Sequence, residues 1–343
     1  MMFNHNTSNW NDWQWQLRNV VTLQQLERVL PADKFKDCRS VDKLFPVKIS
    51  PYYFELLLAE GGNGALSRMV LPDPAELVSA GFPVDPFGES SGAERGNGVK
   101  QRFPDRILVM ASSNCAVNCR HCTRKGLLNN TAVTALHQLD QIVEFIKDNP
   151  LVREVLISGG DPLMLPDAKV LAFVTAFAAL DQIDAVRLCT RMPVTLPMRI
   201  TEKLADELSG CGKLWVNTQF NHVSEITPDA KLACRRLVEA GIPVSNQSVL
   251  LRGVNDSLDE MFRLCCGLQR IRVRPYYVFT CDPIAGIEHF RVERSAALRI
   301  EAQLTEKIGG LAMPRFVEDI PGSKCKSALI NSFSQLRSNA DIS

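Results

Sequence analysis

The sequence predicts an α/β protein: an incomplete (βα)6 barrel with an N-terminal helical segment. Two observations support this fold class. From Arg106 onward an apolar run is followed by a helical pattern six times, and such alternation predicts a parallel sheet with right-handed crossovers. In addition, polar and glycine-containing clusters come directly after the apolar runs, at the strand ends where βα barrels collect their functional residues.

Residues 1–100 are expected to form a mainly helical accessory segment. Residues 9–18 place aromatic side chains on one helical face, a pattern more typical of packing than of ligand binding. Helix breakers recur in residues 46–53 and 72–86, and residues 88–98 have the composition of an exposed loop. We therefore predict a boundary near residue 100, a barrel over residues 101–310, and a C-terminal loop and tail over residues 311–343.

Each predicted barrel unit pairs a short apolar strand with an amphipathic helix. In chain order the units are strand 106–111 with helix 131–147, strand 154–157 with helix 168–180, strand 185–189 with helix 201–209, strand 214–218 with helix 228–240, strand 243–245 with helix 257–268, and strand 272–280 with helix 293–308. Because a closed barrel of this type has eight such units, six units predict a barrel that does not close.

The composition is that of an ordinary globular protein, with 45% hydrophobic and 22% charged residues. A formal charge of +1 gives no reason to expect nucleic-acid binding, and no apolar stretch suggests a signal peptide or a membrane span. Outside one motif, most of the eleven cysteines lie in apolar patterns typical of reduced core residues. We therefore expect a cytoplasmic protein.

Residues 112–125 contain three cysteines, Cys115, Cys119 and Cys122, in the spacing CxxxCxxC. Thiolates are soft ligands that suit iron–sulfur clusters and zinc. Three cysteines would leave one iron of a 4Fe–4S cluster without a protein ligand, and an open metal position indicates chemistry rather than structure. From the spacing alone, a zinc site that includes His121 and a set of unrelated buried thiols stay open as alternatives.

This spacing is the signature of the radical S-adenosylmethionine superfamily, and the sequence resembles the lysine 2,3-aminomutase family over residues 9–326. The matching segments are residues 9–13, 119–124, 158–161, 246–256 and 274–277. The resemblance implies an enzyme that moves an amino group between the α and β carbons of an amino acid. It also implies three cofactors: a 4Fe–4S cluster, S-adenosylmethionine and pyridoxal 5′-phosphate.

The resemblance also implies which residues bind these cofactors. Cys115, Cys119 and Cys122 would hold the cluster. The other cofactor-binding residues would be Ser158, Gly159, Gly160, Asp161, Gln247, Arg102, Arg106 and Lys326. Ungapped alignment from Asp319 makes Lys326 the catalytic lysine that carries pyridoxal phosphate, with Lys324 as the competing candidate. Phe103 and Phe279 stand where relatives can have tyrosine.

Three further residues match the family's substrate-binding positions. Arg124 matches the arginine that fixes the substrate carboxylate, for which a guanidinium fork is well suited. Asp282 and Asp319 match the paired aspartates that receive the distal ammonium of lysine. Because two carboxylates attract a cationic tip and repel a glutamate side chain, we expect L-lysine to be converted to β-lysine.

Other substrates, classes and partners stay open at this point. The alternatives are a protein-bound lysine of elongation factor P, L-arginine, and a non-catalytic iron–sulfur or zinc-binding module. The implied chemistry needs a reducing electron donor such as flavodoxin or ferredoxin. We expect no nucleic-acid or membrane partner, and the sequence leaves a homo-oligomer open.

Overall fold

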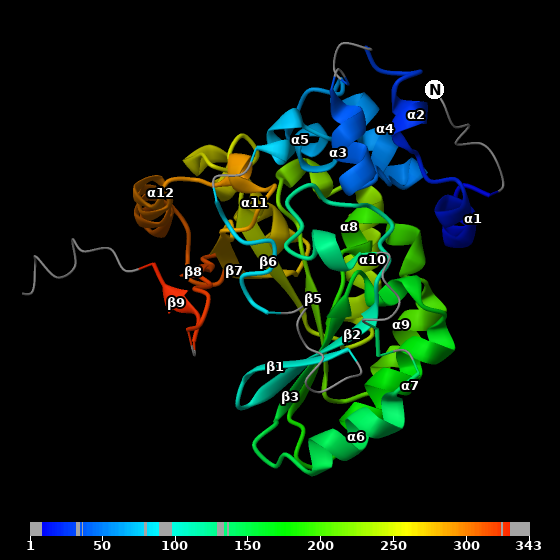
Figure 1. Cartoon of the computed structure of the whole chain (residues 1–343). Coiled ribbons are helices and arrows are strands. Elements are labelled where there is room, and N and C mark those ends of the chain that lie inside the picture. Colours follow the sequence, from blue (N-terminus) through cyan, green and yellow to red (C-terminus); the bar gives the residue numbers. More distant parts are fainter. Residues whose placement is uncertain are drawn as a thin grey trace, which may run out of the picture.

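The computed structural model describes residues 9–31, 35, 37–78, 81–88, 98–128, 134–135, 137–323 and 325–329. It confirms an α/β fold built on one nine-stranded sheet with strands in the order β1 to β9. Strands β2 to β8 run parallel to their neighbours, whereas β1 pairs antiparallel with β2 and β9 antiparallel with β8. Over the described ranges β2 and β8 do not pair with each other, so the barrel is open on one side (Figure 1).

The six predicted strands correspond to β2 through β7, and the structure adds three more. The strands are β1 Val99–Phe103, β2 Arg106–Ser112, β3 Glu154–Gly159, β4 Ala185–Cys189, β5 Leu214–Thr218, β6 Val244–Leu250, β7 Arg274–Thr280, β8 Arg315–Glu318 and β9 Ser327–Ala328. The predicted strand 243–245 was too short. Strand β6 continues because the buried Asn246 and Ser248 side chains bond to the backbone of Phe220, which satisfies polar groups inside the strand.

The six predicted helices are present as α6 Leu139–Lys147, α7 Asp167–Ala178, α9 Glu202–Ser209, α10 Pro228–Glu239, α11 Leu258–Arg270 and α12 Arg294–Lys307, with the short α8 Met192–Thr195 after β4. Helices α9, α10 and α11 each begin after a hydroxyl residue that accepts a backbone N–H three positions later: Thr201, Thr227 and Ser257. The predicted start of α6 at residue 131 was wrong, since α6 begins at Leu139, and residues 131–133 lie outside the described residues.

The N-terminal helices lie over one end of the barrel (Figure 1). They are α1 Trp13–Arg18, α2 Leu23–Leu26, α3 Cys38–Leu44, α4 Pro51–Ala59 and α5 Ala65–Val70. Ser50 donates its hydroxyl to the carbonyl of Thr195 after β4, and the Tyr53 hydroxyl donates to Glu225 after β5. These helices therefore cover the loops that follow the strands. The aromatic face of residues 9–18 does pack: Trp10 is buried, and Trp13 stacks on Arg199.

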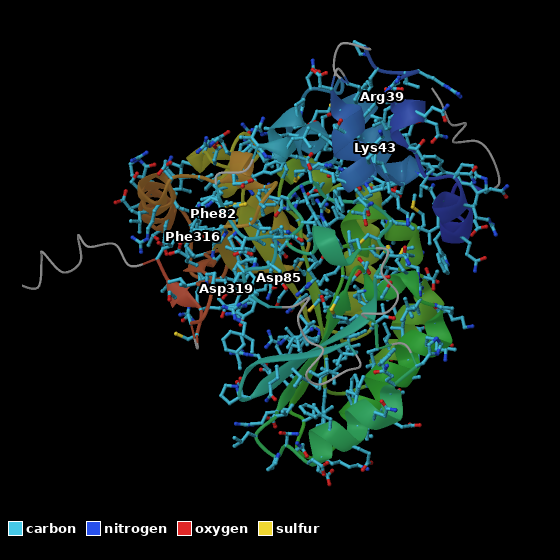
Figure 2. All side chains as sticks on the ribbon, in the orientation of Figure 1. Arg39, Lys43, Phe82, Asp85, Phe316 and Asp319 are labelled. Carbon is cyan, nitrogen blue, oxygen red and sulfur yellow. The ribbon has the colours of Figure 1, made fainter. Side chains whose placement is uncertain are left out.

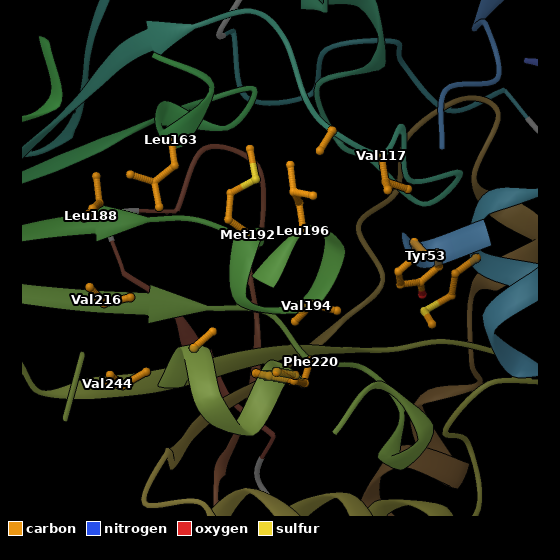
Figure 3. Packing of buried hydrophobic residues seen from close by; sticks show 14 of the residues in the cluster. Tyr53, Val117, Leu163, Leu188, Met192, Val194, Leu196, Val216, Phe220 and Val244 are labelled. Carbon is orange, nitrogen blue, oxygen red and sulfur yellow. The ribbon is translucent and has the colours of Figure 1, made fainter. Parts of the chain in front are cut away.

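One continuous hydrophobic core joins the N-terminal helices to the barrel. Figure 3 shows Leu188, Val216 and Val244 on neighbouring strands, with Phe220 and Tyr53 further along the same cluster. The boundaries near residues 100 and 310 remain predictions. Among the described residues, no helix combines the length and the apolar character needed to cross a bilayer.

Candidate active site

All of the predicted site residues line one cavity of about 800 Å³. The cavity extends from the cysteine loop after β2, past the end of β3, to Lys326 beside the last strand. Arg124 and Asp282, which follow β2 and β7, lie on its wall, as does Gln247 in β6. The structure therefore brings together side chains that are up to 224 residues apart in the chain, from Arg102 to Lys326. Lys324 lies outside the described residues.

The cysteine loop is held by the backbone of the N-terminal helical segment. The amide of Asn118 donates to the carbonyl of Lys48 at 2.8 Å, and its side chain donates to the carbonyl of Pro46 at 2.9 Å. The amide of Arg120 donates to the carbonyl of Met69 at 2.7 Å. These bonds fix the loop backbone between Cys115 and Cys122, which orients the thiols before any metal binds.

The three thiols are unpaired and electrostatically coupled. Burial raises the pKa of Cys115, and the neighbouring Cys122 and Asp161 raise it further. Burial and then Cys119 raise the pKa of Cys122 to about 11. Thiolates so close together repel each other and need a cationic partner. The iron ions of an iron–sulfur cluster, which cysteine thiolates bind, can supply the positive charge.

The loop suits a cluster better than a single ion. Within the described residues, no three His, Cys, Asp or Glu side chains come together as ligands of one metal ion. In a cluster each thiolate binds its own iron, so the sulfurs can lie further apart. The ring of His121 is buried, and its Nε2 lies 3.2 Å from the side-chain amide nitrogen of Asn221.

The two glycines after β3 allow the strand end to approach the cysteine loop. Gly159 has φ of 112°, and a Cβ there would lie 2.2 Å from the carbonyl oxygen of Ser112. A Cβ at Gly160 would lie 2.5 Å from the carbonyl oxygen of Asn114. The amides of Gly160 and Asp161 donate to these same carbonyls. Any side chain at either glycine would push β3 away from the loop.

Asp161 ties the ends of β3 and β4 together. Its buried carboxylate accepts the hydroxyl of Thr190 at 2.8 Å, the amide of Arg191 at 2.7 Å and the amide of Leu163 at 2.9 Å. Burial raises its pKa, and these hydrogen bonds partly offset that effect. The role of Asp161 in cofactor binding stays a prediction, because these three donors to its carboxylate belong to the protein itself.

Arg191 belongs to the polar cluster after the predicted strand 185–189, and the sequence analysis assigned it no role. Its guanidinium donates to Cys119 Sγ at 2.8 Å and to the carbonyl of Gln219 at 3.1 Å, and it pairs with the buried carboxylate of Glu225. Glu225 also accepts the hydroxyl of Tyr53 at 2.8 Å. A positive charge is thus fixed beside a cysteine of the loop. The signal in the sequence was an arginine directly after a strand of the barrel.

Unpartnered polar atoms also line the cavity. The side-chain amide nitrogen of Asn217 and the side-chain hydroxyl of Thr218, both at the end of β5, are buried and have no hydrogen-bond partner in the described structure. A buried unpaired polar group is costly, so these atoms indicate a polar ligand between the cysteine loop and β5. They fit the ribose hydroxyls and base of a nucleoside such as the one in S-adenosylmethionine.

Lys326 lies at the other end of the cavity against two aromatic rings. Its Nζ is 4.5 Å from the ring centre of Phe279 and 4.9 Å from that of Tyr277. Burial lowers its pKa to about 8, with Asp319 opposing the shift and the guanidinium groups of Arg187 and Arg106 adding to it. An amine that loses its proton this easily is a nucleophile suited to a carbonyl cofactor, so the residues fit pyridoxal phosphate.

The arginines near Lys326 already have carboxylate partners. Arg102 Nη2 lies 2.7 Å from Asp319 Oδ1. Glu154, at the start of β3, pairs with Arg187 and lies 4.0 Å from Arg106. The sequence analysis assigned Arg102 to the cofactor and Asp319 to the substrate, and it did not identify Arg187 or Glu154.

Comparisons with known proteins show which family the chain resembles. A family model described as the Radical SAM superfamily matches residues 109–265. L-lysine 2,3-aminomutase from Acetoanaerobium sticklandii is 38% identical over 338 residues, which cover 96% of this chain and 81% of that protein. L-lysine 2,3-aminomutase from Clostridium subterminale is 36% identical over 331 residues, covering 95% and 79%. Glutamate 2,3-aminomutase from Clostridioides difficile is 32% identical over 335 residues, covering 96% and 79%.

A solved structure supports the fold. The crystal structure of Streptococcus suis SuiB bound to precursor peptide SuiA matches with a TM-score of 0.52 and 16% sequence identity, covering 68% of this chain and 52% of that one. At this identity the likeness concerns the arrangement of strands and helices alone.

Proposed function

Since the chain belongs to the lysine 2,3-aminomutase family of radical SAM enzymes, we propose that it moves the α-amino group of L-lysine to the β carbon, giving β-lysine. It is therefore an isomerase. One observation carries the proposal: a single cavity joins the three-cysteine loop to Lys326. A cluster bound at the cysteines and a pyridoxal phosphate bound at Lys326 would therefore face the same space.

The residues of the cavity would hold three cofactors, each at its own place. Cys115, Cys119 and Cys122 would bind a 4Fe–4S cluster, and the end of β3 with Gln247 would bind S-adenosylmethionine. When bound, the cluster and S-adenosylmethionine supply a carbon-centred radical that takes a hydrogen atom from the substrate, and pyridoxal phosphate supplies the carbonyl to which the migrating nitrogen is attached.

Lys326 is the residue we propose for holding pyridoxal phosphate covalently. Its lowered pKa keeps a usable fraction of the amine neutral, and the rings of Tyr277 and Phe279 form an apolar floor on which a pyridine ring can lie. Arg102 and Arg106 would bind the phosphate, a group for which guanidinium donors are well suited.

Charge would select the substrate. Arg124 would receive the α-carboxylate, and Asp282 and Asp319 would receive the distal ammonium at the opposite end of lysine. A glutamate side chain would place a third negative charge beside two carboxylates inside a partly enclosed cavity, where repulsion is weakly screened. The proposed pair of carboxylates would therefore favour lysine over glutamate.

The reaction also needs an electron, so we propose a small reducing protein such as flavodoxin or ferredoxin as the donor. A cytoplasmic location is proposed as well, supported by eleven cysteines that form no disulfide in the described structure. We also propose boundaries near residues 100 and 310 that divide the chain into three parts. The N-terminal segment would frame the cysteine loop, the barrel would form the cavity, and the C-terminal loop would supply the lysine.

The test is anaerobic incubation of the reconstituted enzyme with L-lysine, L-arginine, L-glutamate and lysine-bearing elongation factor P, followed by mass-resolved product analysis. We expect β-lysine from L-lysine alone. Conversion of the protein-bound lysine or of L-arginine, with L-lysine left unchanged, would replace the proposed substrate. A protein that neither cleaves S-adenosylmethionine nor shows pyridoxal absorbance would be a non-catalytic module instead.

A further inference from the structure

An ion pair between Arg102 and Asp319 bridges the open side of the barrel. Arg102 lies on β1 at one edge of the sheet, and Asp319, labelled in Figure 2, directly follows β8 near the other edge. Arg102 Nη2 is 2.7 Å from Asp319 Oδ1 and also donates to the carbonyl of Ile320 at 3.0 Å. The guanidinium stacks on Phe87, 4.4 Å from its ring centre.

The two partners are mostly withdrawn from solvent. The Arg102 side chain is 26% exposed and that of Asp319 is 16% exposed, so water and salt screen their attraction only in part. Asp319 also lines the cavity that contains Lys326, and its negative charge raises the pKa of that lysine. The same carboxylate therefore lies between an arginine and the space for the substrate.

We propose that Arg102 is a specificity-determining residue that acts through Asp319: while Arg102 holds the carboxylate, a distal cation is received poorly, and an anion bound to Arg102 releases Asp319 for that cation. The inference rests on the proposed function and concerns the same site. In this proposal the Arg102–Asp319 ion pair is replaced by two others: Arg102 pairs with the phosphate of the cofactor, and Asp319 pairs with the ammonium of the substrate.

The sign of this coupling follows from the geometry. A phosphate on Arg102 must compete with Asp319, and an ammonium on Asp319 must compete with Arg102. Whichever ligand binds first separates the pair, so the second ligand meets a group that is already free. Coupling of this kind is reciprocal, because the factor by which phosphate strengthens lysine binding equals the factor by which lysine strengthens phosphate binding.

The test uses the full chain with its cluster and S-adenosylmethionine, before pyridoxal phosphate is added. L-lysine is titrated by anaerobic calorimetry with and without saturating inorganic phosphate at constant ionic strength. We expect phosphate to lower the Kd of L-lysine about tenfold, within the roughly 5–150-fold range typical of coupled sites. L-norleucine, which has a neutral side chain of similar length, is expected to show no change.

Three variants separate this role from a structural one. Asp319→Asn is expected to abolish the phosphate effect. Asp282→Asn, the matched control, is expected to weaken lysine binding with and without phosphate while the effect persists. Arg102→Gln is expected to weaken phosphate binding but to strengthen lysine binding in phosphate-free buffer, whereas mere damage to the fold would weaken both.

Several results would overturn the inference. Phosphate that leaves the lysine Kd unchanged would do so, and so would an equal effect on norleucine or loss of the effect in Asp282→Asn. If Arg102→Gln does not fold, the comparison of lysine with norleucine in the unmodified protein decides the matter. Formation of β-lysine without any phosphate effect would refute this inference alone, whereas absence of β-lysine would refute the proposed function.

Discussion

Lys326 should react with pyridoxal phosphate at a much lower pH than an ordinary lysine needs for the same reaction. Its pKa is lowered from 10.5 to about 8 by burial, with Arg187 and Arg106 contributing and Asp319 opposing. At pH 7.5 a pKa of about 8 leaves about a quarter of the amine neutral, against about one part in a thousand at 10.5. Only the neutral amine attacks a carbonyl, so attachment should be about 200-fold faster than for an unshifted lysine.

Two substitutions should move this pKa in opposite directions. Arg187→Gln removes a cation near Lys326, which should raise the pKa of Lys326 and slow attachment at pH 7.5. Asp319→Asn removes the carboxylate that holds the proton on the amine, so the pKa should fall and attachment at pH 7.5 should become faster. Because the two variants should shift the pKa of Lys326 in opposite directions, they separate an electrostatic effect from general damage to the site.

The assay is the rate at which the absorbance of covalently held pyridoxal phosphate appears after mixing, measured from pH 6 to pH 10 with the cofactor in excess. The rate should rise with a midpoint near pH 8 and level off above it. Lys326→Ala, which has no amine, provides the baseline. A midpoint near 10.5, or shifts of the same sign in both variants, would refute the reasoning.

The same shift makes a statement about folding stability. The pKa of Lys326 is lower in the folded protein than in the unfolded chain, so between about pH 8 and 10.5 the unfolded chain binds more protons. The cost of burying this amine is therefore fully present below pH 8 and disappears as the pH rises to 10.5. Its upper limit is about 3 kcal/mol, and partial exposure of the side chain reduces it.

Three further outcomes test the assignments of individual residues. Anaerobically reconstituted protein should hold about four irons per chain, and Cys119→Ala should lose cluster and activity together, whereas stoichiometric zinc without iron would contradict the cluster. Borohydride reduction in the presence of pyridoxal phosphate should label Lys326, and a label on Lys324 would move the assignment by two residues. Asp282→Asn should cost about 2–5 kcal/mol in kcat/KM for lysine and much less for norleucine, and equal losses would make Asp282 structural.

The sequence was sufficient to predict the parts of the fold in which apolar residues recur at a regular spacing. The strand–helix alternation predicted β2 to β7 and their helices, because apolar strands and amphipathic helices have different spacings of apolar residues. Strand β8 was missed because only Phe316 and Val317 are buried in it, which is too short a pattern to recognise. The three cysteines, the Gly-Gly turn and the lysine loop were predicted from motif and resemblance. The cysteines, both glycines, and Asp319 and Lys326 of the lysine loop line the cavity.

Charged residues inside strands were a signal that the sequence analysis did not use. A parallel strand covered on both faces is normally apolar throughout. Arg187 lies in the middle of β4, and Glu154 begins β3 one strand away. Arg187 does not fit a sheet with two buried faces, so it indicates that one face of the sheet borders a polar cavity, and Arg187 does line the cavity. This would have predicted the charges near Lys326 without any knowledge of the family.

The role of the N-terminal segment could not have been predicted in this way. The cysteine loop is held by the backbone carbonyls of Pro46, Lys48 and Met69, and every residue type offers a carbonyl. One side-chain contact comes from Glu76, whose buried carboxylate pairs with Arg120 between two of the cysteines and with Lys125 just after them. A lone glutamate is usually solvated, so its sequence context gives no hint of two buried partners. The segment expected to be accessory is thus part of the frame that orients the thiols.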